Sequence, residues 1–319
     1  MTELYTTARS PIVEPHLQVW GWEIPVYLFL GGFTAGLLVL SGWALWRGRR
    51  SFGGGRGAGL ALASGGTFLL GLMAISAGML ALFLDLTHKP YFWRLYVTFE
   101  PRSPMSWGSW ILLLVYPVLL AGVLLDPPAR LLGRVPGLRA LARRLERTPG
   151  ARRAVGVLAM GAGALLGIYT GILLSALGAR PLWSSALLGP LFLVSGLSAG
   201  AAFGHLVSPD AEERTALARA DNALLAAELA LIVLLLIGLA TSTRAHAEAA
   251  ALLLGGPFTA VFWVVVVGLG IVLPFAIQSL SLAERIRHTP LAPLLVLAGG
   301  LALRFVIVYA GQASRWPRL

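Results

Sequence analysis

Apolar residues run along this chain in long blocks that are separated by short polar segments. Each block has about 20 residues, the length that a helix needs to cross a hydrocarbon core of roughly 30 Å. Eight such blocks are present, near residues 24–46, 60–86, 107–125, 153–177, 184–207, 221–241, 257–280 and 292–311. The pattern predicts eight transmembrane helices, and an even number of crossings places both termini on the same side of the membrane.

The composition excludes a soluble globular protein. Hydrophobic residues make up 57% of the 319 residues, charged residues only 12%, and the mean hydropathy is +0.79. A soluble domain has charges on roughly a quarter of its residues. The longest segment between two predicted spans, 126–152, is shorter than the roughly 50 residues of a small domain. We therefore expect an all-α, multi-pass membrane protein without a separate soluble domain.

The formal net charge of +11 is distributed unevenly between the two sides of the predicted topology. If the N-terminus is outside, roughly twice as many arginine and lysine residues lie in the inside loops as in the outside segments. Cytoplasmic loops carry such an excess of positive charge. This pattern predicts that both termini lie outside, and it accounts for the positive charge without a nucleic-acid partner.

Much of the inside charge lies in one segment, residues 131–153, with the sequence LLGRVPGLRALARRLERTPGARR. On a helix, Leu138, Leu141 and Leu145 share one face and arginines occupy the other. A basic amphipathic helix of this kind lies in the membrane interface. The segment predicts a surface helix on the inner leaflet, with anionic lipid as its partner.

Cysteine is absent from the sequence. The chain therefore has no thiolate for an iron–sulfur cluster, a disulfide or a metal site, and any such cluster must belong to a partner. A membrane haem b needs two histidines that face each other within spans. Because only His205 of the five histidines lies near a span interior, we expect no haem in this chain.

A short internal repeat divides the chain into halves. The sequence FLGGFTAG, from Phe29 to Gly36, resembles FLVSGLSAG, from Phe192 to Gly200. Each copy begins a group of four spans, which predicts two tandem four-helix bundles, residues 1–180 and 181–319. Chance similarity among small residues is the alternative. Small residues four positions apart also allow neighbouring helices to approach closely.

Ionisable and phenolic residues gather at the predicted outer ends of the first four spans. Glu23 begins the first span and follows His16, Asp85 and His88 end the second, and Tyr169 lies roughly two turns from the outer end of the fourth. A quinone, which carries two electrons and two protons, needs hydrogen-bond partners and a group that exchanges protons near neutral pH. Asp85 and His88, three residues apart, would share a helix face.

A simpler interpretation exists for the same residues. Glu23 can lie at headgroup level, and Asp85 and His88 can end the second helix and face water. The loop after them favours a functional role because it is rich in aromatic and cationic residues, typical of a protein contact surface. Interfacial lipid could account for some of its aromatic residues, which are Tyr91, Phe92, Trp93, Tyr96 and Phe99.

The second half contains ionisable residues within its predicted spans. Glu228 lies about two turns into the sixth span and Arg304 about three turns into the eighth. Charged groups are costly in hydrocarbon unless they are paired or hydrated, so both are candidates for a proton path or an ion pair. With His205 and Gln278 near inner ends, they could line a water-filled half-channel, or Glu228 and Arg304 could form a purely structural bridge.

Five fragments occur in the order WGWEIPVYLFLGGFTAG, DLTHKPYFW, RSPMSWGSW, FLVSGLSAG and LRFVIVYAGQ. Together the fragments resemble the NrfD/PsrC family, the integral-membrane quinone subunits of bacterial respiratory oxidoreductases. The resemblance covers nearly the whole chain. It implies eight helices in two four-helix bundles with no cofactor of their own. It also implies a partner subunit with several 4Fe–4S clusters and a molybdenum–bis-pterin catalytic subunit on the outer side of the bacterial cytoplasmic membrane.

The resemblance also assigns residues. It implies a quinone site near the outer face, with Asp85 from the DL…P motif, and it associates Arg304 and Gln312 with the LR…AGQ motif. The turn expected to face the partner comprises Arg102, Ser103, Pro104, Met105 and Ser106. Two features depart from the family: Glu23 stands where proline is common, and the 126–153 loop is longer than in compact members.

These observations predict a membrane subunit that exchanges electrons between menaquinone or ubiquinone and an iron–sulfur partner. The predicted quinone site contains His16, Glu23, Asp85, His88 and Tyr169. The predicted proton path contains Glu228, Arg304 and His205. One alternative is a secondary transporter built from two tandem halves, although broken helices at matching places in the two halves are not seen. Another alternative is a passive membrane anchor for a soluble enzyme.

Overall fold

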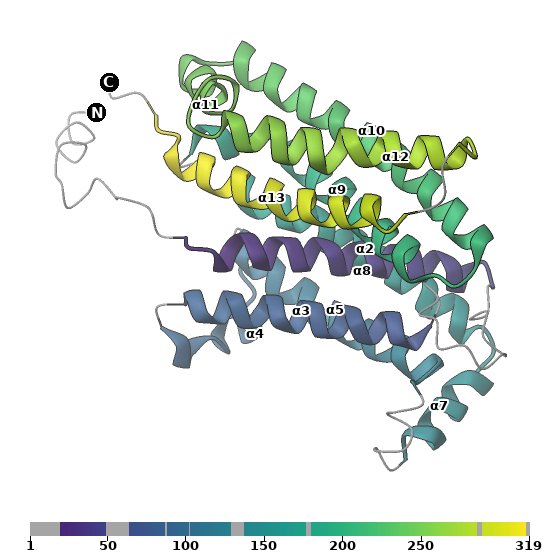
Figure 1. The fold of residues 1–319 in the computed structure, drawn as a ribbon. Helices are drawn as coiled ribbons and strands as arrows, with labels where there is room; N and C mark the ends of the chain where they lie inside the picture. Colours follow the sequence, from purple (N-terminus) through teal and green to yellow (C-terminus); the bar gives the residue numbers. More distant parts are fainter. Residues whose placement is uncertain are drawn as a thin grey trace.

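The computed structural model of the chain describes residues 20–48, 64–86, 88–101, 103–128, 137–176, 180–285 and 289–316. All regular secondary structure in these residues is helical (Figure 1). His16 and Arg102 lie outside the described residues.

Eight helices among the described residues are long and apolar enough to cross a membrane, which confirms the predicted number of spans. They are α2 (Glu23–Trp46), α3 (Gly65–Asp85), α5 (Pro104–Leu125), α8 (Ala151–Ser175), α9 (Leu188–Val207), α10 (Ala211–Thr241), the continuous pair η3 (Val261–Val272) and α12 (Leu273–Leu282), and α13 (Leu291–Ala313). The segment η3 is π-helical.

Helix α10 begins ten residues before the predicted sixth span. The Asp210 side chain caps it by accepting a hydrogen bond from the Glu212 backbone N–H at 3.2 Å. Glu212 and Glu213 lie in the first turn, where negative charge is favourable at a helix N-terminus. A hydropathy pattern does not detect these polar turns, so the prediction began the helix too late.

Shorter helices lie between the spans: η1 (Lys89–Tyr91), α4 (Arg94–Val97), α7 (Leu138–Arg147), η2 (Pro181–Trp183) and α11 (Arg244–Leu254). Helix α7 lies within the predicted amphipathic segment but is shorter than it. Gly137 and Gly150, with φ of +83° and +76°, adopt left-handed backbone conformations on either side of α7. The α11 helix was not predicted.

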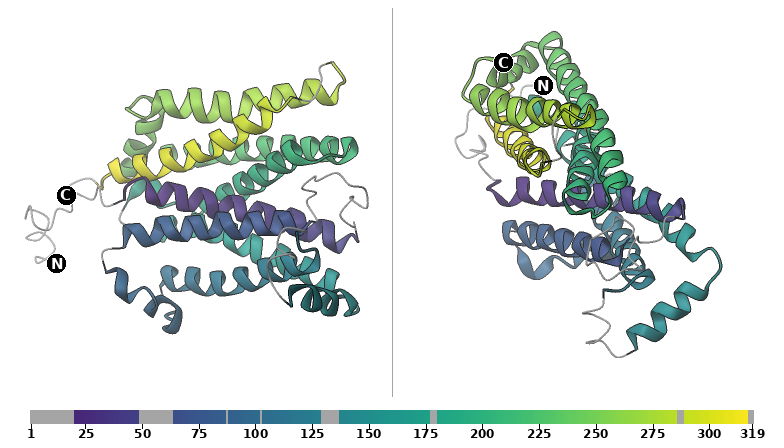
Figure 2. Two further views of the ribbon diagram at one scale, coloured as in Figure 1. Left: turned by 60° about the horizontal axis from the view of Figure 1, so that its bottom comes forward. Right: turned by 45° about the vertical axis from the view of Figure 1, so that its right-hand side comes forward.

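The helices pack side by side in a consistent order (Figures 1 and 2). In the first half, α2 contacts α3, α3 contacts α5, α5 contacts α8, and α8 returns to α2. In the second half, α9 contacts α10, α10 contacts α12, α12 and η3 contact α13, and α13 returns to α9. Between the halves, α2 contacts α9 and α13, and α8 contacts α9.

The two copies of the glycine motif lie against each other where α2 meets α9. A Cβ added at Gly196 would lie 2.5 Å from the Gly32 carbonyl oxygen, and one added at Gly200 would lie 2.6 Å from the Gly36 carbonyl carbon. The helices are therefore parallel and their backbones touch. This confirms the predicted packing role of the small residues.

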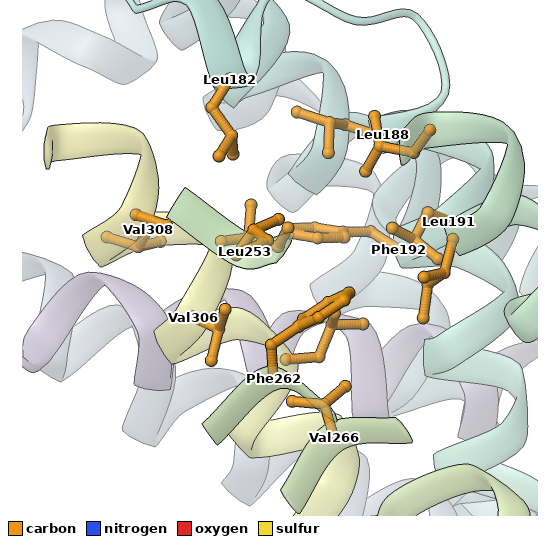
Figure 3. Close-up of a cluster of buried hydrophobic side chains, with 14 of the residues drawn as sticks. Leu182, Leu188, Leu191, Phe192, Leu253, Phe262, Val266, Val306 and Val308 are labelled. Carbon is orange, nitrogen blue, oxygen red and sulfur yellow. The ribbon is translucent and has the colours of Figure 1, made fainter. Parts of the chain in front are cut away.

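A cluster of buried apolar side chains fills one end of the second half, drawn in Figure 3. It joins α9 to η2, α11, η3 and α13, and its members include Leu182, Leu188, Leu191, Phe192, Leu253, Phe262, Val266, Val306 and Val308. This end of the second half is therefore apolar. The buried polar side chains described below, such as Asp221 and Glu228, lie outside this cluster.

Candidate functional site

Glu23 and Asp85 lie at the same end of the molecule, which we call the carboxylate end. Glu23 is the first residue of α2 and Asp85 the last residue of α3, and the two helices run antiparallel (Figure 1). Both side chains are partly buried. Glu23 and Lys89 are the charged neighbours that act electrostatically on Asp85. The structure thus brings together two carboxylates that are 62 positions apart in the sequence.

His88 lies beyond the end of α3. The chain leaves the helix at Leu86, whose ψ is 126°, so the helical spacing that would place His88 on the face of Asp85 does not apply. His88 is exposed and precedes the short helix η1. Of the two residues expected to share a proton, Asp85 is the one with a carboxylate, that of Glu23, among its electrostatic neighbours.

Tyr169 is buried below the carboxylates, in α8. A Cβ added at Gly108 of α5 would overlap the Tyr169 phenol, so the ring lies directly against the α5 backbone. Tyr27 of α2, which was not among the predicted site residues, is 2% exposed and is an electrostatic neighbour of Tyr169 and Tyr96. Tyr27 is four residues after Glu23 and therefore on the same helix face, a signal that could have identified it.

Phenol side chains, whose hydroxyls can donate hydrogen bonds, lie below the carboxylates. Tyr27 is 2% exposed and Tyr169 is 6% exposed. Partial burial, assisted by Tyr116, raises the pKa of the Tyr96 phenol above its usual value, which keeps its proton in place. Carboxylates above and protonated phenols below form a site that can both exchange protons and donate hydrogen bonds.

The loop between α3 and α5 is tied down by side chains of α5. Ser106 accepts a hydrogen bond from the Glu100 N–H at 3.0 Å, the Trp107 indole donates to the Pro101 carbonyl at 2.8 Å, and Ser109 donates to the Leu95 carbonyl at 2.6 Å. Ser106 is therefore turned inward, 5% exposed, whereas Met105 is 53% exposed. Ser103 is the N-cap and Pro104 the first residue of α5.

This anchored loop presents aromatic side chains to the outside. Arg94 stacks over the Tyr91 ring at 4.6 Å, and Phe99 packs edge-on against Trp107 and Trp110. We call this group the aromatic surface; its exposed members are Tyr91, Phe92, Trp93, Phe99, Met105, Trp107 and Trp110. It lies directly beside Asp85 along the chain.

A second polar cluster is buried between α9, α10 and α13. Arg304, 1% exposed, donates to the Ser195 hydroxyl, to the Gly300 carbonyl at 3.1 Å and to the Phe192 carbonyl at 3.1 Å. The buried Glu228 carboxyl also hydrogen-bonds Ser195. In the described residues Glu228 and Arg304 form no direct ion pair, so the serine hydroxyl links them.

Asp221 extends this cluster and was not among the predicted residues. It is fully buried and accepts hydrogen bonds from the Ser198 hydroxyl at 2.6 Å and the Gln278 amide at 2.7 Å. Asp221 precedes Glu228 by seven residues, two turns or about 10.5 Å along the same helix face. It was overlooked because it was the first residue of the predicted span, and the seven-residue spacing would have revealed it.

His205 and Gln312 lie toward opposite ends of the molecule. His205 is buried in the last turn of α9, seven residues after Ser198, toward the end opposite the carboxylates. Gln312 lies at the carboxylate end, where its side chain pairs with the Trp20 backbone, accepting from its N–H at 3.2 Å and donating to its carbonyl at 3.0 Å. Gln312 thereby fixes the segment that leads into α2.

The fold and its buried polar groups define a multi-pass membrane protein in which ionisable residues lie at one end and within the second half. The family described as polysulphide reductase, NrfD, matches residues 12–314. The chain belongs to this NrfD family, which confirms the resemblance seen in the sequence.

Individual relatives agree over nearly their whole length. The C chain of polysulfide reductase from Wolinella succinogenes is 34% identical over 318 residues, covering 92% of this chain and 94% of the relative. Protein NrfD of Escherichia coli is 33% identical, covering 93% and 96%, and the NrfD homolog of Haemophilus influenzae is 30% identical, covering 95% and 97%.

Proposed function

We propose that this chain is the quinone-reactive membrane subunit of a respiratory oxidoreductase that exchanges electrons with an iron–sulfur partner. The observation that carries the proposal is that Glu23 and Asp85 lie at the same end of two adjacent spans, within electrostatic range of each other, above the buried phenols of Tyr27 and Tyr169. The Wolinella relative, which is named as a part of polysulfide reductase, supports a place in a reductase complex.

The residues of the carboxylate end suit the proton chemistry of a quinol. Oxidation of a quinol to a quinone releases two electrons and two protons. Glu23 and Asp85 can accept the protons at the surface, and the phenols of Tyr27 and Tyr169 can hydrogen-bond the ring oxygens. The electrons leave for a cluster in the partner, because this chain has no cysteine to hold one. Menaquinone and ubiquinone both fit this scheme, in either direction.

The proposed complex places the partner on the aromatic surface. Exposed tryptophan, tyrosine and methionine beside Arg94 have the composition of a protein contact, and the surface lies next to Asp85. Here the partner is an iron–sulfur subunit with 4Fe–4S clusters, joined to a molybdenum–bis-pterin catalytic subunit. In this scheme the carboxylate end and both termini face the outside of the bacterial cytoplasmic membrane, and residues 1–180 and 181–319 are two four-helix bundles.

The second half is proposed to carry protons. Asp221, Ser198 and Gln278 form one hydrogen-bonded group, and Glu228, Ser195 and Arg304 form another two turns along α10. With His205 toward the far end, these groups place polar side chains at several depths between that end and the middle of the second half. This arrangement supports a proton path that operates alongside quinone chemistry.

The same buried charges favour one other class of function, a secondary transporter with two tandem halves. Uptake of a solute by the chain alone in liposomes would support that class. A passive anchor, in contrast, would tolerate changes at every ionisable residue.

The deciding experiment is Asp85→Asn in the assembled complex. We expect quinol oxidation to fall by about 10²-fold, because the variant lacks the general base, and quinone-analogue binding to weaken. Activity with a soluble artificial donor, which reaches the partner directly, should not change. Asp126→Asn is the matched control, since Asp126 is partly buried at the opposite end of the first half. Unchanged quinol oxidation in Asp85→Asn would contradict the proposal and favour an anchor.

A further inference from the structure

The end opposite the carboxylates, which we call the arginine end, has an open hollow that the proposed function does not use. Its described lining residues are Trp46, Arg47 and Arg153. Trp46 and Arg47 are at the end of α2, and Arg153 is in the first turn of α8. Two cationic side chains from different spans therefore border one hollow.

Close backbone packing brings these two arginines together. A Cβ added at Gly156 of α8 would lie 2.7 Å from the Gly42 carbonyl oxygen and 2.9 Å from the Trp46 backbone nitrogen. Because α2 and α8 run antiparallel, Arg47 and Arg153 both lie toward the same end from this contact. Arg47 is further positioned by stacking over the Trp43 ring at 4.8 Å.

Among the described residues, no salt bridge joins Arg47 or Arg153 to a carboxylate. The ion pair found among the described residues joins Arg244 and Glu248, far from the hollow. Helix α7 adds a second hollow lined by Arg143, Arg144 and Arg147, at the same end of the molecule (Figure 1). Arginines that converge and form no ion pair within the described residues suit an anion, and the planar guanidinium group binds phosphate in a bidentate manner.

Apolar surface beside the hollow indicates that a phosphate bound there would be part of a lipid. Trp43 and Trp46 are exposed at this end, as is typical of headgroup depth. Val157 lies one turn after Arg153 on the same face of α8 and is exposed, as is Leu158, so an acyl chain can lie along the helix. Leu141 of α7 is also exposed beside arginines, as expected for a helix in the membrane interface.

We propose that Arg47, Arg153 and Trp46 form a binding site for the phosphodiester headgroup of an anionic phospholipid, in the leaflet at the arginine end. The arginines bind the phosphate, Trp46 packs against the headgroup, and the acyl chain follows Val157. Helix α7 lies in the same headgroup layer and holds further anionic lipid near the site. This binding is independent of the quinone site at the other end.

The test is native mass spectrometry of the full chain in detergent, titrated with phosphatidylglycerol, with phosphatidylcholine and with inorganic phosphate. We expect one tightly retained phosphatidylglycerol and little retained phosphatidylcholine. Arg47→Gln with Arg153→Gln should weaken phosphatidylglycerol binding about 30-fold, from about 1 kcal/mol for each arginine near anionic lipid. Arg244→Gln is the control, because it removes an exposed arginine elsewhere and should retain the lipid.

A lysine pair checks that the loss does not reflect misfolding. Arg47→Lys with Arg153→Lys keeps both charges and should bind phosphatidylglycerol more tightly than the glutamine pair. Equal retention of phosphatidylglycerol and phosphatidylcholine, or retention unchanged in the glutamine pair, would overturn the proposal. Binding of inorganic phosphate that displaces phosphatidylglycerol at equal concentration would also overturn it, since the site would then take a free anion.

Discussion

At the scale of single residues, the contact between Gly108 and Tyr169 fixes the position of the Tyr169 phenol in the candidate quinone site. The phenol lies where any larger residue at position 108 would place its Cβ. A bulkier residue there must therefore displace Tyr169, α5 or both. Interiors packed this closely do not absorb an added methyl group without cost.

Gly108→Ala is expected to destabilise the chain by about 1–3 kcal/mol, the usual cost of overpacking, and to weaken quinone-analogue binding. The measurement is the apparent melting temperature of the purified protein in detergent, with a binding titration on the same sample. Gly161→Ala in α8 is the matched control, because nothing lies within 4 Å of its added Cβ. If Gly108→Ala melts like the control, Tyr169 is not held against α5.

Glu228 provides a second test at this scale. Glu228→Gln removes the ionisable group but keeps a side chain that can pair with Ser195, so proton translocation should fall roughly tenfold or more while quinone binding stays intact. Proton movement is followed with a pH-sensitive dye in vesicles that contain the whole complex. Glu248→Gln, at an exposed glutamate of α11, is the control. Equal loss of proton movement and quinone binding would argue against a separate route.

The sequence predicted some of these residues and not others for a physical reason. Glu23 and Asp85 are visible because a carboxylate at the edge of an apolar run stands out. Tyr27 was missed because a phenol within a span carries no charge, and Asp221 was missed because its place as the first residue of a predicted span does not show that Ser198 and Gln278 surround it. The serine that links Glu228 to Arg304 depends on how α9 packs, which no local pattern encodes.

At the scale of helices, the contact between α2 and α9 depends on four glycines that leave no space for side chains. Gly196→Ala should destabilise the protein by about 1–3 kcal/mol, because the new Cβ would lie 2.5 Å from the Gly32 carbonyl oxygen. The rate at which folded protein is lost from a size-exclusion peak on warming measures the effect. Gly238→Ala in α10, with nothing within 4 Å, should have no such effect; a similar loss in both would implicate general glycine sensitivity.

Hydropathy predicted the long helices well because lipid requires about 20 apolar residues in each crossing. Hydropathy did not predict helix ends that are set by capping side chains or by glycines in turns. The first turns of α10 are set by the Asp210 cap, and α7 is limited by the left-handed glycines Gly137 and Gly150. Helix α11, with its exposed Arg244–Glu248 pair, is too short and too polar to register as a span.

At the scale of the whole molecule, the sequence predicted eight spans and a repeat, but not that the two copies of the repeat would touch. Chain order constrains neighbouring helices through short loops. It does not specify which face of the first span meets the fifth. The contact of α2 with both α9 and α13 therefore had to come from the structure.

The orientation of the molecule can be tested because the chain has no cysteine, so single cysteines can be introduced. In intact spheroplasts, Met105→Cys on the aromatic surface should react with a membrane-impermeant maleimide, and Arg144→Cys in α7 should react only after the membrane is opened. Docking of the proposed iron–sulfur partner should reduce labelling of Met105→Cys. The opposite labelling pattern would reverse the proposed topology.

The position of α2 has a mechanical consequence for how distant sites communicate. This helix begins at Glu23, touches α9 backbone to backbone at its middle, and ends beside Arg47. A Cβ at Gly32 would lie 3.1 Å from an Arg304 nitrogen. Because glycines leave no side chain between α2 and α9 at this contact, any tilt of α2 would press directly on the α9 backbone and on the groups around Arg304.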